Sequence, residues 1–166
     1  MGDISMRSFG VLFDAEKVGA EVASPVLSSL SEFGELTMKR AYADWGAADA
    51  QPWARELARH AIAPMQQTEF SVGRHADRSA LVVHALDLHH AGVLDGFAIV
   101  CGDDSYARLA SKLHEGGAFV VGVGGPGVSS VFKSACTRYL DLEEIHTYAS
   151  ANRVARAAAA MGLRTA

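Results

Sequence analysis

Short apolar runs alternate along the chain with segments in which apolar residues recur every three or four positions. The apolar runs predict β-strands. They are residues 8–14, 35–43, 65–70, 96–102, 118–124 and 139–143, the last of them a short edge strand. The segments with helical spacing predict amphipathic helices. These are residues 24–34, 51–62, 76–92, 105–114 and 128–139.

This alternation predicts the fold class. Strands that alternate with helices form a doubly wound, mainly parallel sheet with helices on both faces, which is a three-layer α/β fold. The chain has 166 residues, the length of a single domain. We expect that domain over residues 1–143 and an alanine-rich helix over residues 144–166 that packs on the domain or extends from it. In such folds, functional residues gather beyond the carboxyl ends of the strands.

Composition and charge narrow the function classes. Hydrophobic residues make up 49% of the chain and charged residues 20%, as in ordinary globular proteins. The formal net charge of −4 gives no strongly basic footprint, so a nucleic acid would have to bind a local patch. The two cysteines are too few for a disulfide framework. No apolar run is long enough to span a membrane and no signal peptide is apparent, so we expect a cytoplasmic protein.

Acidic residues follow two of the apolar runs. Asp14 is the first polar residue after the first run, and Asp103 and Asp104 follow the fourth. If these strands are neighbours, Asp14 and Asp103 lie close together, and they repel unless a proton, a cation or a metal compensates. Mg²⁺ or Mn²⁺ is the usual functional answer and suits phosphodiester hydrolysis. The alternative is that Asp103 or Asp104 only caps the following helix.

The fifth run leads through "GVGGPGVSS" into a predicted helix. A glycine-rich loop before a helix can hold a phosphate on the backbone amides of the helix start. This loop lacks the lysine of a P-loop and the spacing of a dinucleotide fingerprint. Ser129 and Ser130 are therefore either phosphate-binding residues or plain caps of the helix.

Five segments, in this order and spacing, resemble the NYN domain family. They are "GVLFDAEKV", "KRAYADWG", "GRHADRSALVVHALDL", "FAIVCGDDSYARLASKLHEGGAFVVGVG" and "SSVFKSACTRYLDLE", and they cover roughly residues 8–143. The family has a PIN-like, Rossmann-like nuclease fold. The resemblance therefore implies metal-dependent cleavage of RNA by carboxylates at the strand ends.

The family's acidic positions are only partly retained. Asp14 matches the aspartate of the Asp-x-x-Asn motif on the first strand, and Asp103 matches the first aspartate of the Ser-x-Asp-x-Asp-Phe motif on the fourth. Other positions where the family has carboxylates or an amide carry Lys17, Arg78, His84, Ser105 and Thr137. The resemblance therefore implies a nuclease fold whose activity is weakened or lost.

Arg78 stands where a helix aspartate is expected, so the local charge changes by two units. We expect its guanidinium to bridge Asp14 and Asp103 in place of a metal ion. The alternative is that Arg78 points to solvent and the two aspartates still bind Mg²⁺ through waters. Asp77 is adjacent, and a further alternative is that its side chain turns toward the strand ends and partly replaces the lost carboxylate. His84 is expected to be half-buried, to pack and to make one hydrogen bond.

Two functions remain open. The first is a metal-dependent endoribonuclease in which Asp14 and Asp103 bind Mg²⁺ or Mn²⁺ and Asp77 or Asp104 assists. The second is a non-catalytic RNA-binding or protein-interaction module on the same fold, in which cations contact phosphates. The cations near the strand ends are Arg74, Arg78, Arg108, Lys112 and Lys133. RNA is the expected partner, and a homodimer or a protein partner is the alternative.

Overall fold

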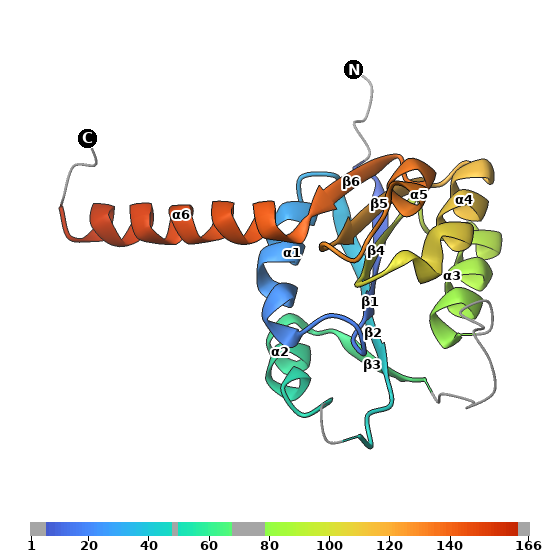
Figure 1. The fold of residues 1–166 in the computed structure, drawn as a ribbon, viewed down its shortest axis with the longest axis horizontal. Helices are drawn as coiled ribbons and strands as arrows, with labels where there is room; N and C mark the ends of the chain where they lie inside the picture. Colours follow the sequence, from blue (N-terminus) through green and yellow to red (C-terminus); the bar gives the residue numbers. More distant parts are fainter. Residues whose placement is uncertain (1–5, 48–49, 68–78, 163–166) are drawn as a thin grey trace.

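The computed structural model describes residues 6–47, 50–67 and 79–162. Its centre is a six-stranded sheet in the order β3-β2-β1-β4-β5-β6 (Figure 1). The strands are β1 (Ser8–Asp14), β2 (Glu35–Ala43), β3 (Ala63–Gln66), β4 (Gly96–Cys101), β5 (Phe119–Gly124) and β6 (Arg138–Asp141). All five pairs of neighbouring strands are parallel, which confirms the predicted fold class.

Helices cover both faces of the sheet (Figure 1). One face carries the 3-10 turn η1 (Ala20–Val22), α1 (Ala23–Leu30), α2 (Trp53–His60) and the start of α6 (Leu142–Ala160). The other carries α3 (Ala80–Ala91), the 3-10 turn η4 (Asp104–Tyr106), α4 (Ala107–Glu115) and α5 (Ser130–Ala135). Side chains of β1 alternate between the two cores: Phe13 packs with α1 and α2, while Leu12 packs with α3 and α4.

β3 and α5 differ from the prediction in ways that the structure explains. β3 runs from Ala63 to Gln66 rather than over residues 65–70, of which residues 68–70 lie outside the described part. It contains Pro64, which an edge strand tolerates because, in the part of the chain that the structure describes, β3 pairs with a strand on one side alone. α5 ends at Ala135 rather than near residue 139, because Cys136 is extended and the Thr137 amide bonds the Val120 carbonyl at 2.8 Å.

The order of the strands places a switch point between β1 and β4. From β1 the chain first adds β2 and β3 on one side, and it then crosses to add β4, β5 and β6 on the other. At such a point the connections leave in opposite directions and open a crevice beyond the carboxyl ends of the strands. Phe13 of β1 lies opposite Val100 of β4, so the residues that follow these strands leave the sheet next to each other.

The long helix α6 begins at Leu142, two residues before the predicted start, where the Asp141 carboxylate accepts a hydrogen bond from the Glu143 amide at 2.8 Å. Only its first turns pack on the domain, where Ile145 is 7% exposed in the core beside α1. Farther along, the side chain of Val154 is 69% exposed, and the helix extends away from the domain (Figure 1). Within the described residues, no helix combines the length and the apolar character that a membrane crossing requires.

Two substitutions on α6 test where this helix contributes to stability. Ile145→Ala is expected to lower the free energy of unfolding by about 2–3 kcal/mol, because it leaves a cavity in the core. Val154→Ala is expected to change it by less than about 0.5 kcal/mol, because that side chain is exposed. Urea denaturation followed by circular dichroism measures both. Equal losses in the two variants would contradict this packing of α6.

Candidate functional site

Asp14 ends β1 and is the one buried charged residue among those the structure describes, with 3% of its surface exposed. Its carboxylate lies on the sheet face covered by α3 and α4, on the same side as Leu12. One oxygen, Oδ2, accepts a hydrogen bond from the Tyr106 hydroxyl at 2.9 Å. The other, Oδ1, accepts one from the Glu16 amide at 3.3 Å. Both oxygens are therefore held in place by the protein.

Burial raises the pKa of Asp14 from 3.8 to about 6, because the charged form loses its hydration. The hydrogen bonds from Tyr106 and from the Glu16 amide lower this pKa, and the negative charges of Glu16 and Asp103 raise it further. Burial and the Asp14 charge also raise the pKa of Tyr106, so the phenol keeps its proton and acts as the donor. At neutral pH the site contains a carboxylate that is ionised but poorly solvated.

Asp103 and Asp104 follow β4 at the switch point. The Asp103 carboxylate accepts a hydrogen bond from the Ser105 amide at 2.9 Å and so caps η4, as the capping alternative expected for one of the two. Asp104 instead reaches the loop after β5, where its Oδ1 accepts a hydrogen bond from the Ser129 amide at 2.8 Å. The charge of Asp103 acts on Asp14, whereas Asp104 ties two loops together.

The glycine-rich loop before α5 has the geometry of a plain cap. The Ser129 hydroxyl accepts a hydrogen bond from the Val131 amide at 3.2 Å, and Ser130 is the first residue of the helix. The Ser129 amide, which a phosphate would use at this helix start, already bonds Asp104. An internal carboxylate therefore takes one of the donors that the phosphate alternative requires.

The number of carboxylates at the switch point limits which metal ion the protein could bind there. Within the described residues, no three His, Cys, Asp or Glu side chains lie together as a set of metal ligands. Asp14 and Asp103 remain as a pair. Magnesium is often bound by one or two carboxylates, with water and substrate phosphate oxygens as its other ligands. The pair fits a hard divalent ion of this kind, provided that water or substrate supplies the remaining ligands.

Several residues singled out in the sequence lie outside the described part. Arg74, Asp77 and Arg78 fall in residues 68–78, so the bridge from Arg78 and the help from Asp77 stay predictions. The chain is described again from Ser79, whose side chain caps α3 through the Val82 amide at 3.2 Å.

His84 confirms the packing role expected for it. It is half-buried on α3, and its Nδ1 lies 3.1 Å from the Tyr42 hydroxyl, within hydrogen-bond distance. The two rings pack at 5.5 Å between their centres. Tyr42 is buried near the end of β2 and also interacts with Arg40, so His84 joins a small polar cluster on this face.

The three described cations among those predicted to contact phosphates lie in two environments. Arg108 and Lys112 lie one helical turn apart on α4 and line a shallow groove of about 250 Å³ between α4 and Val131 of α5. Lys133 instead lies over the Tyr139 ring, with its Nζ 4.8 Å from the ring centre. The structure therefore brings Arg108 and Lys112 together on one surface.

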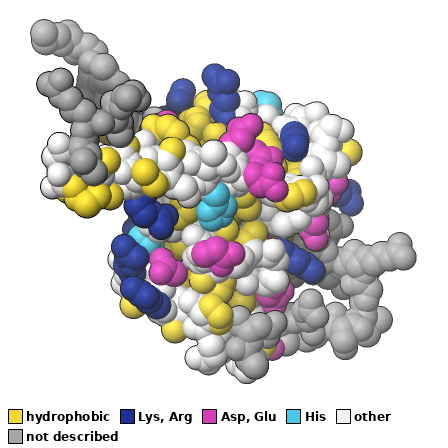
Figure 2. All heavy atoms as spheres, turned by 60° about the vertical axis from the view of Figure 1, so that its left-hand side comes forward, with side chains coloured by type: hydrophobic (Ala, Val, Ile, Leu, Met, Phe, Trp, Pro, Cys, Tyr) yellow, Lys and Arg dark blue, Asp and Glu magenta, His cyan; other side chains and the backbone are white. Residues whose placement is uncertain are grey.

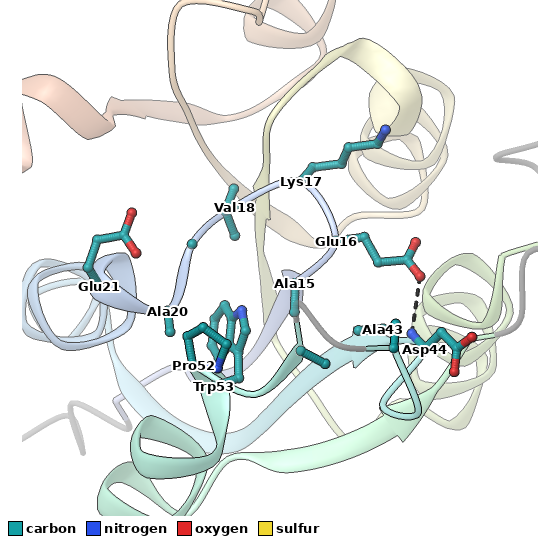
Figure 3. Close-up of a pocket in the computed structure, with 13 residues that line it drawn as sticks. Ala15, Glu16, Lys17, Val18, Ala20, Glu21, Ala43, Asp44, Pro52 and Trp53 are labelled. Atoms are coloured by element: carbon teal, nitrogen blue, oxygen red, sulfur yellow. Dashed lines mark hydrogen bonds between the residues drawn. The ribbon is translucent and has the colours of Figure 1, made fainter.

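A pocket of about 580 Å³ lies on the other side of the β1 end, where β1 and β2 meet η1 and α2 (Figure 3). Its walls include Ala15, Ala43 and Trp53. The acidic residues Glu16, Glu21 and Asp44 also line it. We did not predict this pocket from the sequence. The local signal in the sequence is the presence of small residues after both strands, Ala15, Gly19 and Ala20 after β1 and Ala47 and Ala50 after β2, because small side chains near a strand end leave space.

Comparisons with known proteins support the fold. A family model described as the NYN domain matches residues 7–143. The chain is also similar to a crystal structure of a protein of unknown function from Vibrio parahaemolyticus. That likeness has 13% sequence identity and a TM-score of 0.67, and it covers 85% of this chain and 96% of the other. No curated protein matches the chain.

The raised pKa of Asp14 predicts a specific pH dependence of stability. Between about pH 4 and about pH 6 the folded protein holds a proton on Asp14 that the unfolded chain has released, so its stability falls as the pH rises. Relative to Asp14→Asn, the wild-type free energy of unfolding should fall by about 3 kcal/mol across this window and change little above it. Urea denaturation in EDTA measures this difference, and a value independent of pH would contradict the prediction.

Tyr106→Phe tests the hydrogen bond directly. It removes the donor that stabilises the charged form, so the pKa of Asp14 should rise above about 6. The loss of stability should then continue to higher pH. An NMR titration of the Asp14 carboxyl carbon measures the pKa in both proteins, and an unchanged or lower pKa would show that the tyrosine hydroxyl does not hold this carboxylate.

Proposed function

The chain belongs to the NYN domain family, and on this basis we propose that it is a weak, metal-dependent endoribonuclease. The observation that carries the proposal is the buried Asp14 carboxylate beside Asp103 at the switch point of a nuclease-type fold. This is the position in a doubly wound sheet at which ligands bind.

The energetics of Asp14 favour a functional role over a structural one. Burial, partly offset by the hydrogen bonds, raises its pKa from 3.8 to about 6, which corresponds to about 3 kcal/mol of destabilisation when the group is ionised. An apolar or amide side chain could fill the same space without this penalty. Strongly perturbed carboxylates in crevices are typical of active sites. The Asp14 carboxylate therefore lowers the stability of the fold when it is ionised, and a role in binding or catalysis accounts for it better than a structural role.

The residues present suggest how such a site would work. Asp14 and Asp103 would hold Mg²⁺ or Mn²⁺, and the bound ion would neutralise phosphate charge and acidify a water molecule. Tyr106 and the Glu16 amide orient the Asp14 carboxylate. Arg108 and Lys112 offer positive charge for neighbouring phosphates.

The activity is expected to be weak because the site has lost oxygen donors. Lys17 and Ser105 occupy positions where the family has an amide and a carboxylate. Fewer oxygen ligands weaken the hold on a divalent ion and leave its geometry less defined.

A second function, RNA binding without cleavage, is favoured by a separate observation. Both Asp14 oxygens already accept hydrogen bonds from the protein, so the carboxylate is satisfied without a metal. Arg108 and Lys112 could still contact the RNA backbone from the α4 groove. Such binding would be independent of sequence and would weaken as salt increases.

The two functions are separated by incubating the purified protein with mixed single-stranded RNA and Mn²⁺. We expect slow cleavage that EDTA abolishes and that Asp14→Asn reduces by at least about tenfold, as loss of a metal-binding group does. Asp87→Asn is the matched control, because Asp87 is exposed on α3. Cleavage that persists in Asp14→Asn would contradict the role of Asp14. Salt-sensitive binding without cleavage would support the second function instead.

A further inference from the structure

The pocket at the end of β1 is separate from the Asp14 site but shares a wall with it. Asp14 points to the α3–α4 face, whereas Ala15 packs against the opposite core. The turn that forms this wall also carries Glu16, whose amide bonds Asp14 while its side chain lines the pocket. Anything bound in the pocket would therefore lie one turn of backbone away from the carboxylate pair.

Apolar walls make the pocket suitable for a small organic group. In Figure 3, Pro52 and Trp53 lie beside Ala20 at the lower left, Val18 lies above them, and Ala43 lies to the right next to Asp44. Trp53 is 2% exposed and packs edge-on against Phe13, with 5.5 Å between the ring centres, so this wall is rigid. A volume of about 580 Å³ lies within the range of pockets that bind small ligands.

The charges around the pocket are mainly negative. Glu16, Glu21 and Asp44 supply three carboxylates against one ammonium, from Lys17. Lys17 extends away from Glu21 and Trp53, whereas Glu16 points toward Asp44 (Figure 3). Such a rim favours, inside the pocket, an uncharged group that presents hydrogen-bond donors over a group that is itself negatively charged.

Glu16 and Glu21 differ in whether their carboxylates already accept hydrogen bonds from the protein. The Glu16 carboxylate accepts hydrogen bonds from the Asp44 amide at 3.1 Å and from the Gln67 side chain at 3.4 Å, so its position is fixed. Glu21 folds back over Gly19, where a Cβ would collide with its carboxylate. Within the described residues, Glu21 makes no hydrogen bond or ion pair, so its oxygens are available to a ligand.

We propose that this pocket binds one nucleobase of a single-stranded RNA and prefers guanine, with Glu21 accepting its hydrogen bonds. The inference rests on the proposed action on RNA and adds a base-specific subsite to it. Guanine presents two adjacent donors, N1–H and N2–H, that match the two oxygens of one carboxylate. Uracil presents one donor between two carbonyl oxygens, which the carboxylate repels. Guanine is therefore the favoured base and uracil the disfavoured one.

Binding of short RNAs tests the subsite without depending on cleavage. The probes are a fluorescein-labelled oligouridine and the same oligomer with one central guanosine, titrated with the full chain in EDTA. We expect the dissociation constant of the guanosine probe to be at least about fivefold lower, the discrimination of one bidentate contact. Fluorescence anisotropy measures both constants.

Two variants and their matched controls assign the preference to the pocket. Ala50→Leu fills the pocket from a half-buried lining position, and Glu21→Gln replaces one acceptor oxygen by a donor. In both variants the dissociation constant of the guanosine probe should rise to that of oligouridine, while the dissociation constant of oligouridine stays unchanged. Ala54→Leu and Glu32→Gln alter exposed residues outside the pocket and should keep the preference.

The outcomes distinguish this inference from the proposed function. Equal affinity for the two probes, or a preference that survives both pocket variants, would overturn the subsite even if Asp14-dependent cleavage is found. A pocket-dependent guanine preference without cleavage would support the subsite and overturn the nuclease proposal alone. Failure to bind either RNA, or capture of an arginine-rich peptide that Ala50→Leu blocks, would overturn the subsite in favour of a protein partner.

Discussion

The hydrogen bond from Tyr106 to the buried Asp14 carboxylate joins the two halves of the sheet where they meet. Asp14 ends β1, and Tyr106 belongs to the turn after β4, so the bond spans the switch point. It also makes burial of the charge tolerable, because an ionised carboxylate without a donor would be far more unfavourable there. The geometry of the site depends on this pair, since the two residues lie 92 positions apart in the chain.

The turn after Asp14 gives this end of the sheet two different surfaces. On the α3–α4 side it leaves the Asp14 carboxylate, on which the charge of Asp103 acts, and α4 on the same face carries Arg108 and Lys112. On the α1–α2 side it leaves a pocket with small apolar walls and an acidic rim. A polynucleotide carries phosphates along its backbone and bases beside it. The face with the α4 cations suits the phosphates, and the pocket with apolar walls suits a base. Together they suit a strand that crosses the β1 end with its backbone on one side and a base on the other.

The chain belongs to the NYN domain family, but the acidic residues at its strand ends are largely engaged in contacts within the protein. The family implies an oxygen-rich metal site, yet here Asp103 caps η4 and Asp104 ties down the loop before α5. Among the described residues, Asp14 alone is a buried carboxylate with a raised pKa. Such a site keeps the architecture of a nuclease fold, and a metal bound there would have to take most of its ligands from water and substrate.

Local pattern was sufficient for most elements. The strands at residues 8–14 and 35–43 were predicted with their observed bounds, because apolar periodicity and flanking turns are properties of neighbouring residues. Asp14 and Asp103 could likewise be located at strand ends, and the five ordered motifs indicated the family. The sequence did not determine that Tyr106 would hold Asp14, that Asp104 would bond Ser129, or that alanines from two strand ends would enclose a pocket. Only the tertiary structure decided these, because each depends on residues from distant elements that the strand order brings together.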